Sequence, residues 1–156
     1  MNIRDNQPVP PLLDYMARGG TIRDLRNMDQ SQLDAIYQVA FARFNSGQFR
    51  EALQMFRHLC LLDHTRYAYF LGLGMAQYQL GDYARAGATL AHGEKLDDSD
   101  PRASLMLAHC FAELERWSLA RQALSETVRR ASASGRWRDE SQQAEKLLLK
   151  VNSKLR

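Results

Sequence analysis

The chain has 156 residues, of which 45% are hydrophobic and 25% are charged, and its formal net charge is +3. This balance is typical of a soluble globular domain and excludes a disordered chain, and the length suffices for a core without metal ions or disulfides. No run of 18 apolar residues predicts a membrane span and no apolar stretch predicts a signal peptide, so we expect a cytoplasmic protein.

Residues 1–30 form an N-terminal region without the periodicity of the rest. Residues 1 to about 9 are mostly polar and lead into a proline-rich stretch, which predicts a flexible arm. A short amphipathic helix follows and is stopped by Gly19-Gly20, and Ile22 and Leu25 indicate one more helical turn. The apolar face of the short helix consists of Leu12, Leu13, Tyr15 and Met16.

Residues 31–134 repeat at a fixed step of 34 without a gap. Six columns agree in size and chemistry. They are Val39, Leu73, Leu107; Ala40, Gly74, Ala108; Gly47, Gly81, Glu115; Phe49, Tyr83, Trp117; Ala52, Ala86, Ala120; and Phe56, Leu90, Leu124. Glu115 is the one exception, in the glycine column. The period and the columns resemble the tetratricopeptide repeat, a pair of antiparallel helices.

Three stacked helix pairs are therefore expected, in an all-α fold whose neighbouring pairs bury a continuous core. The predicted helices lie near 31–46 and 49–62, near 66–80 and 83–96, and near 101–114 and 117–132. Small residues allow the paired helices to approach closely. Gly47 and Gly81 suit a left-handed turn at the end of the first helix of each pair.

Residues 135–156 predict a final helix that caps the stack. One side of it is apolar and consists of Ala144, Leu147, Leu148 and Val151. From Arg129 to Arg156, eight basic residues outnumber three acidic ones, which gives +5 here and −2 elsewhere. We interpret these charges as a solvated capping face. Nucleic-acid binding is the less favoured alternative, because only Trp137 offers a stacking ring beside them.

The residues do not indicate an active site, a cofactor or a metal. The four histidines lack ligand spacing, and Gly72 and Gly74 lie within a predicted helix and not in a phosphate-binding loop. Cys60 and Cys110 lie on apolar stretches of different repeats, so we interpret them as buried free thiols, with a disulfide or a metal pair as the alternative. The sequence favours a binding protein over an enzyme.

The first helix of each pair lines the concave side of such a stack, and its outward positions five, nine and twelve are mostly large and apolar. With Met106 beside them, these positions predict a groove that binds an extended apolar peptide. The candidate residues are Tyr37, Phe41, Phe44, Leu71, Met75, Tyr78, Leu105, Met106 and His109. The alternative is that these side chains pack between neighbouring helices.

Three stretches, 36–64, 69–86 and 97–110, carry a more specific resemblance. Their most specific pieces are Phe56-x-x-Leu59-Cys60-x-Leu62-Asp63-His64, the run from Tyr69 to Gly74, and Asp100-Pro101-Arg102, together with Gly19-Gly20-Thr21-Ile22. Over about residues 12 to 128 the chain closely resembles the class II chaperones of bacterial type III secretion, which look after the pore-forming translocators.

The resemblance implies a cytoplasmic chaperone that holds a short segment of a secreted translocator, containing proline and leucine, until export. The family's groove aromatics fall on Tyr37, Phe41 and Phe44. The resemblance also implies a homodimer formed through Leu12, Leu13, Tyr15 and Met16. The third repeat departs from the family, with Ala103-Ser104-Leu105 at a place that tends to be aromatic. The alternative is a repeat adaptor or regulator with another protein partner, in which charged groove residues would be more common than the single Arg102 found here.

Overall fold

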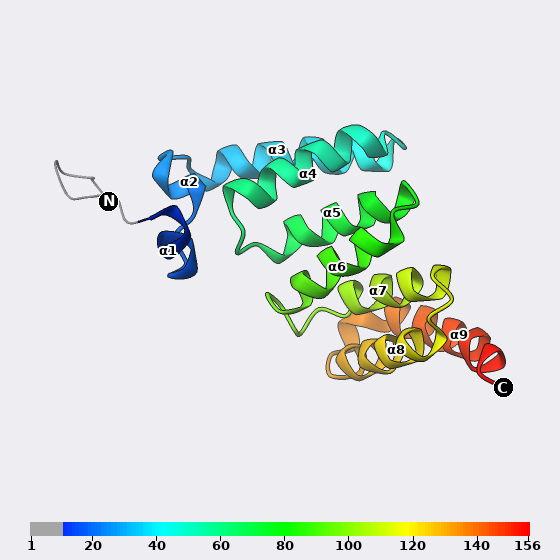
Figure 1. The fold of residues 1–156 in the computed structure, drawn as a ribbon. Coiled ribbons are helices and arrows are strands. Elements are labelled where there is room, and N and C mark those ends of the chain that lie inside the picture. Colours follow the sequence, from blue (N-terminus) through cyan, green and yellow to red (C-terminus); the bar gives the residue numbers. More distant parts are fainter. Residues whose placement is uncertain (1–10) are drawn as a thin grey trace.

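The computed structural model describes residues 11–156, so the predicted arm lies outside the described residues. Two short helices, α1 (Leu12–Ala17) and α2 (Ile22–Leu25), precede three longer pairs (Figure 1). The pairs are α3 (Gln30–Asn45) with α4 (Phe49–Leu62), α5 (Tyr67–Gln79) with α6 (Tyr83–Glu94), and α7 (Arg102–Glu113) with α8 (Trp117–Ser132). A 3-10 turn, η1 (Gly135–Trp137), leads into α9 (Arg138–Lys154). The predicted all-α repeat fold is confirmed, and no helix of the described part is long and apolar enough to cross a membrane.

The pairs lie one after another along the stack (Figure 1). Helix α4 packs against both α3 and α5, α6 joins α5 to α7 in the same way, and α9 packs along α8. The buried side chains form two core groups. The first contains Phe56 and Leu59, and the second contains Leu90 and Leu124. Val151 of α9 belongs to the second group, so α9 covers this end of the stack as predicted.

Close helix packing depends on the small residues of the repeat. Ala40, Ala52, Ala86, Ala108 and Ala120 are all fully buried. A Cβ atom on Gly74 would lie 2.6 Å from Cγ of Leu90, and one on Gly72 would collide with the ring of Phe56. A larger side chain would force apart the two helices of a pair at Gly74 and two neighbouring pairs at Gly72.

The turn inside each pair has a left-handed residue at the same position. Gly47 and Gly81 have φ angles of +78° and +80°, which confirms the predicted role of the glycine column. Glu115 adopts the same kind of conformation, with φ of +56°, although it carries a side chain. The third repeat therefore keeps the left-handed turn of the other two repeats, although its residue at this position is not glycine.

The two ends of the stack differ. Leu73 of α5 packs against the core of the first pair. Leu107 of α7 is only 7% exposed, because it packs against α6, the second helix of the preceding pair. Val39 occupies the same repeat position on α3 but is 46% exposed. The face of α3 at Val39 is thus an open end, whereas α9 closes the other end.

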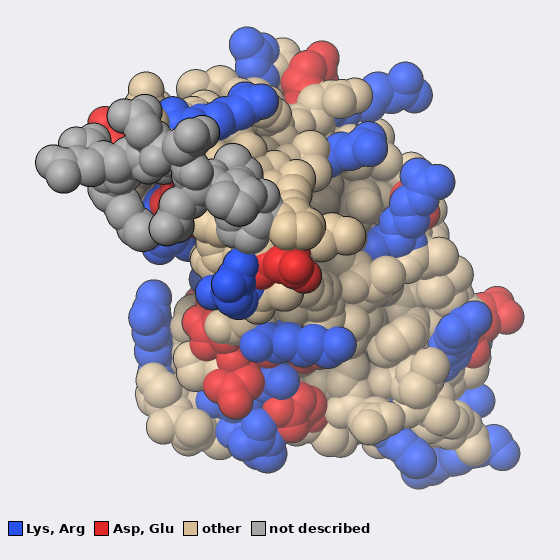
Figure 2. All heavy atoms as spheres, turned by 60° about the vertical axis from the view of Figure 1, so that its left-hand side comes forward, with Lys and Arg blue, Asp and Glu red and all other residues tan. Residues whose placement is uncertain are grey.

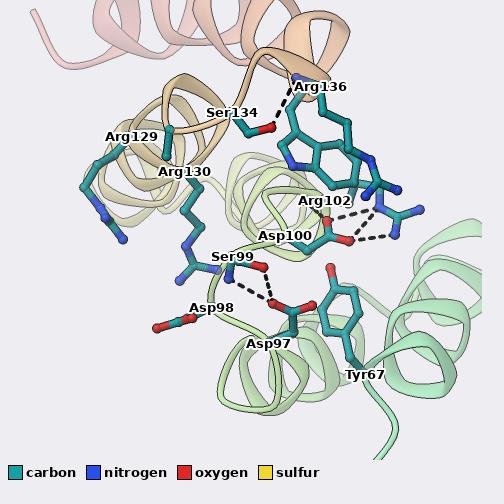
Figure 3. A pocket seen from close by; sticks show the side chains of 12 residues that line it. Tyr67, Asp97, Asp98, Ser99, Asp100, Arg102, Arg129, Arg130, Ser134 and Arg136 are labelled. Atoms are coloured by element: carbon teal, nitrogen blue, oxygen red, sulfur yellow. Dashed lines mark hydrogen bonds and ion pairs between the residues drawn. The ribbon is translucent and has the colours of Figure 1, made fainter.

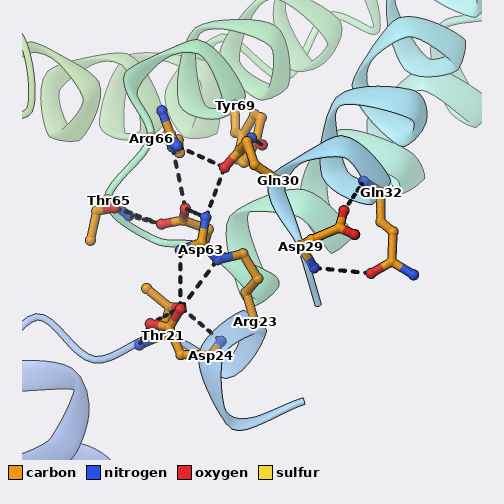
Figure 4. Close-up of polar contacts among 10 residues, drawn as sticks. All are labelled: Thr21, Arg23, Asp24, Asp29, Gln30, Gln32, Asp63, Thr65, Arg66 and Tyr69. Carbon is orange, nitrogen blue, oxygen red and sulfur yellow. Dashed lines mark hydrogen bonds and ion pairs between the residues drawn. The ribbon is translucent and has the colours of Figure 1, made fainter. Parts of the chain in front are cut away.

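Helix α2 is attached to the first pair through Asp63, which follows α4 and is 2% exposed (Figure 4). Its Oδ1 accepts hydrogen bonds from the N–H and the hydroxyl of Thr65, at 3.0 and 2.6 Å. Its Oδ2 lies 3.4 Å from Nε of Arg66 and 3.7 Å from Nη1 of Arg23, which belongs to α2. A buried carboxylate needs such partners, so this contact fixes the place of α2.

Candidate functional site

The predicted peptide-binding residues lie on α3, α5 and α7. Phe41 is 44% exposed, and six others are half-buried. We call these seven residues the first-helix face: Tyr37, Phe41, Phe44, Met75, Tyr78, Met106 and His109. Leu71 and Leu105 are only 7% and 5% exposed and belong to the second core group. The expectation that these two leucines are surface residues is wrong, because α5 and α7 contact each other directly and use them to fill the core.

Aromatic rings form the α3 part of the first-helix face. Tyr37 stacks on Phe41, with ring centroids 6.3 Å apart and an angle of 18° between the planes. Behind it lie Phe56, edge-on at 5.9 Å, and Tyr69 at 5.8 Å. Burial raises the pKa of Tyr37, so its hydroxyl stays neutral. Phe44 packs separately against Phe49 at 5.2 Å.

A second aromatic group lies where α5 meets α7. The ring of Tyr78 is 5.2 Å from Tyr83 and 6.2 Å from His109, and its hydroxyl donates to Oε1 of Glu113 at 3.3 Å. Burial, and then Glu113, raise the pKa of Tyr78 to about 12. Burial lowers the pKa of His109, so the imidazole is mostly neutral at pH 7. The first-helix face therefore offers uncharged, largely apolar contacts from end to end.

Reactive groups are not poised for chemistry in the described residues. Burial raises the pKa of both Cys60 and Cys110 to about 12, which keeps the thiols protonated at neutral pH. Residues 11–156 contain no group of three or more His, Cys, Asp or Glu side chains placed to hold a metal ion.

A charged pocket of about 630 Å³ lies between the α6–α7 connection and the turn before α9 (Figure 3). Its lining includes Tyr67, Asp97, Asp98, Ser99, Asp100, Arg102, Arg129, Arg130, Arg136 and Trp137. Nη2 of Arg102 lies 2.6 Å from Oδ2 of Asp100, and Arg130 lies 2.7 Å from Glu126 and 3.2 Å from Glu94. Sequence reasoning missed this pocket, because it combines an acidic helix start with a basic helix end more than 30 residues later.

The charges of this pocket compensate one another. The guanidinium groups of Arg102 and Arg136 also lie over the ring of Trp137, 5.2 and 4.6 Å from its centroid. On the face shown in Figure 2, acidic side chains likewise lie among the basic ones. The excess of positive charge in the C-terminal sequence is thus partly neutralised by acids from α6, α8 and the α6–α7 connection, which weakens the nucleic-acid interpretation.

The predicted dimerisation residues lie on α1, which no other helix of the described part packs against. Leu12 and Leu13 are 48% and 80% exposed, and Tyr15 and Met16 are half-buried. Tyr15 covers Gly20, where any Cβ atom would collide with the ring. An apolar pair of leucines therefore remains uncovered at this end of the molecule.

Comparison with known proteins agrees with the repeat geometry. Residues 45–127, more than half of the chain, match the family model described as anaphase-promoting complex, cyclosome, subunit 3. The low calcium response locus protein H of Yersinia pestis is 32% identical over 99 residues, which are 64% of this chain and 59% of that protein. The match thus spans less than two thirds of that relative.

Two solved structures extend the likeness over more of the fold. One is PcrH, a protein from Pseudomonas aeruginosa, in complex with the chaperone-binding region of PopD. Its TM-score is 0.81 at 26% identity, and the likeness covers 83% of this chain and 97% of the PcrH chain. The type III secretion translocator chaperone SycD of Yersinia enterocolitica has a TM-score of 0.79 at 28% identity, with coverages of 83% and 97%. The chain therefore belongs to the family that the matching model describes, and its sequence and fold are similar to those of type III secretion translocator chaperones.

Proposed function

We propose that the protein is a cytoplasmic chaperone that holds an extended segment of a type III secretion translocator against the first-helix face before export. The observation that carries the proposal is the row of partly exposed aromatic and methionine side chains on three successive first helices. Apolar groups exposed in a continuous row are characteristic of surfaces that bind a partner. The likeness to PcrH, solved with a segment of PopD, supports a translocator as that partner.

The peptide should bind chiefly through side chains that are partly exposed before binding. Phe41 is the most exposed residue of this face, and Tyr37 supports its ring from one side. Phe44, Met75, Tyr78, Met106 and His109 would extend the contact along α5 and α7. Leu71 and Leu105 would form the floor beneath it, because their side chains are already covered.

Replacing Phe41 by alanine should test this assignment. Truncating an aromatic anchor commonly costs about 2 kcal/mol in binding, or about thirtyfold in Kd. The probe is a synthetic peptide of the PopD chaperone-binding region, titrated calorimetrically into each variant. Val39→Ala is a matched control, because Val39 is 46% exposed on the same helix but two residues away, and so faces nearly the opposite direction. Equal losses for the two variants would contradict a binding site on the first-helix face.

We also propose a homodimer that buries Leu12 and Leu13 of α1. The exposure of two adjacent leucines on a helix that no other helix of residues 11–156 packs against supports this interface. SycD has been solved in an alternative dimer, so association between copies occurs in a structure of the same fold.

A further inference from the structure

Gln30, the first residue of α3, uses the full hydrogen-bonding capacity of its side-chain amide. Its partners Arg23, Arg66 and Tyr69 are drawn in Figure 4. Its Oε1 accepts from Nη1 of Arg23 and from Nη2 of Arg66, both at 2.7 Å. Its Nε2 donates to Oδ1 of Asp34 at 2.7 Å and to the hydroxyl of Tyr69 at 3.3 Å. A primary amide has two lone pairs and two N–H donors, so no capacity is left over. The orientation of this amide is therefore fixed by its partners.

The two guanidinium groups that bind Gln30 are themselves held in place. Both approach the buried Oδ2 of Asp63, Arg66 through Nε at 3.4 Å and Arg23 through Nη1 at 3.7 Å. The carboxylate holds the arginines, and the arginines hold the carbonyl oxygen of Gln30. The amide nitrogen on the other side then reaches both Asp34 and Tyr69, the latter a residue 39 positions later in the sequence.

Tyr69 transmits this restraint to the first-helix face. Its side chain is 3% exposed, and burial raises the pKa of its hydroxyl, which therefore stays neutral and available to the amide. Its ring lies 5.8 Å from the ring of Tyr37 at an angle of 39°. Tyr37 in turn stacks on Phe41, the exposed aromatic residue of that face. A hydrogen-bonded network anchored on the buried Asp63 thus ends on two side chains that we assign to peptide binding.

We propose that Gln30 is a positioning residue for peptide binding. It touches no ligand, and it acts by holding Tyr69 so that the ring of Tyr37 is presented in one orientation to the peptide. Fixing an anchor side chain before binding lowers the entropic cost of forming the complex. The inference rests on the proposed function, since Tyr37 must contact the peptide for the restraint to matter.

Gln32 provides a matched control in the same helical turn. Its Oε1 accepts the backbone N–H of Asp29 at 3.0 Å, and its own N–H donates to Oδ1 of Asp29 at the same distance, which caps α3. Replacing Gln32 by alanine therefore weakens the start of α3 without removing a contact to Tyr69. A loss that came from destabilising the helix start would appear in both glutamine variants.

A double-mutant cycle tests the proposal. Calorimetry with the PopD peptide would compare wild type, Gln30→Ala, Tyr37→Ala and the double variant, with Gln32→Ala in both backgrounds. Removing these hydrogen bonds should weaken binding about tenfold when Tyr37 is present and less than about twofold when it is replaced by alanine. Gln32→Ala should change the Kd less than about twofold in either background. An equal effect of Gln30→Ala in both backgrounds would overturn the inference.

A measurement without peptide separates this inference from the proposed function. Failure of the wild-type protein to bind the PopD peptide would count against the proposed function. The ring proton resonances of Tyr37 in the free protein would still report on positioning, and Gln30→Ala should shift or broaden them more than Gln32→Ala does. Unchanged Tyr37 resonances in Gln30→Ala would overturn the positioning role whatever the peptide does.

Discussion

Glu115 holds a backbone conformation that glycine holds in the other two repeats. A side chain in the left-handed region meets steric repulsion that costs roughly 1 kcal/mol or more. Glu115→Gly should therefore raise the free energy of unfolding by about 0.5 to 1 kcal/mol, since glycine's larger loss of chain entropy offsets part of the gain. Denaturant unfolding monitored by circular dichroism measures the change.

Glu115→Ala is the control for the charge of this residue. Alanine removes the carboxylate but keeps the Cβ atom that causes the repulsion. Equal stabilisation by alanine and glycine would show that the charge, and not the backbone conformation, is the unfavourable feature.

Sequence reasoning at the residue scale succeeded where one period governs the role of a residue. The glycine column predicted the left-handed turns, and it marked Glu115 as the exception before the φ angle was known. The exposure of Leu71 and Leu105 was predicted wrongly, because the repeat gives the direction of a side chain but not how closely adjacent first helices approach. Gln30 carried no signal, since its partners come from α2, from α3 itself and from the start of α5, and one of them is 39 positions away.

At the scale of helices, α8 is fastened through charged side chains near its C-terminal end. Arg130 is 9% exposed and binds Glu126 in its own helix and Glu94 in α6. Hydrogen bonds from Arg129 and then Arg130 lower the pKa of Glu126 to about 2. This ion group joins the second and third pairs across their junction.

Acid should loosen this junction. Because the pKa of Glu126 is depressed in the folded state, its contribution to stability is present above the ordinary glutamate pKa and is lost as the pH falls towards about 2. Thermal unfolding between pH 5 and pH 2 should show a smaller loss of stability for Glu126→Gln than for wild type. Glu145→Gln, an exposed position on α9, is the control. Parallel pH profiles for wild type and Glu126→Gln would contradict the role of this carboxylate.

The helices themselves were predictable because three copies of one pattern reinforce each other. Their bounds lie close to the predicted ranges, and α9 covers the stack through Ala144 and Val151 as its apolar side indicated. The charged pocket was not predictable in the same way. Its members come from helix ends and from the connections between helices, where the repeat pattern is weakest and where charge pairs depend on how successive units are rotated.

At the scale of the whole molecule, the exposed leucines of α1 determine the predicted state of association. Leu12→Ser/Leu13→Ser should convert a homodimer into a monomer, because the double change removes the apolar area that the interface would bury. Sedimentation velocity measures the mass. Leu149→Ser is the control, since Leu149 is 74% exposed on α9, at the opposite end of the stack. An unchanged mass for the α1 variant, or an equal change for both, would rule out this interface.

The difference between Val39 and Leu107 gives the stack a direction. The face of α3 at Val39 is exposed, whereas α9 covers the other end of the repeat array. The two ends are therefore not equivalent. An extended peptide also has a direction, from its amino to its carboxyl end. Two directional chains laid side by side have two inequivalent arrangements, parallel and antiparallel, and these place each peptide side chain against a different repeat. If the first-helix face binds a segment as we propose, that segment and the same residues in reversed order would therefore make different contacts with the repeats.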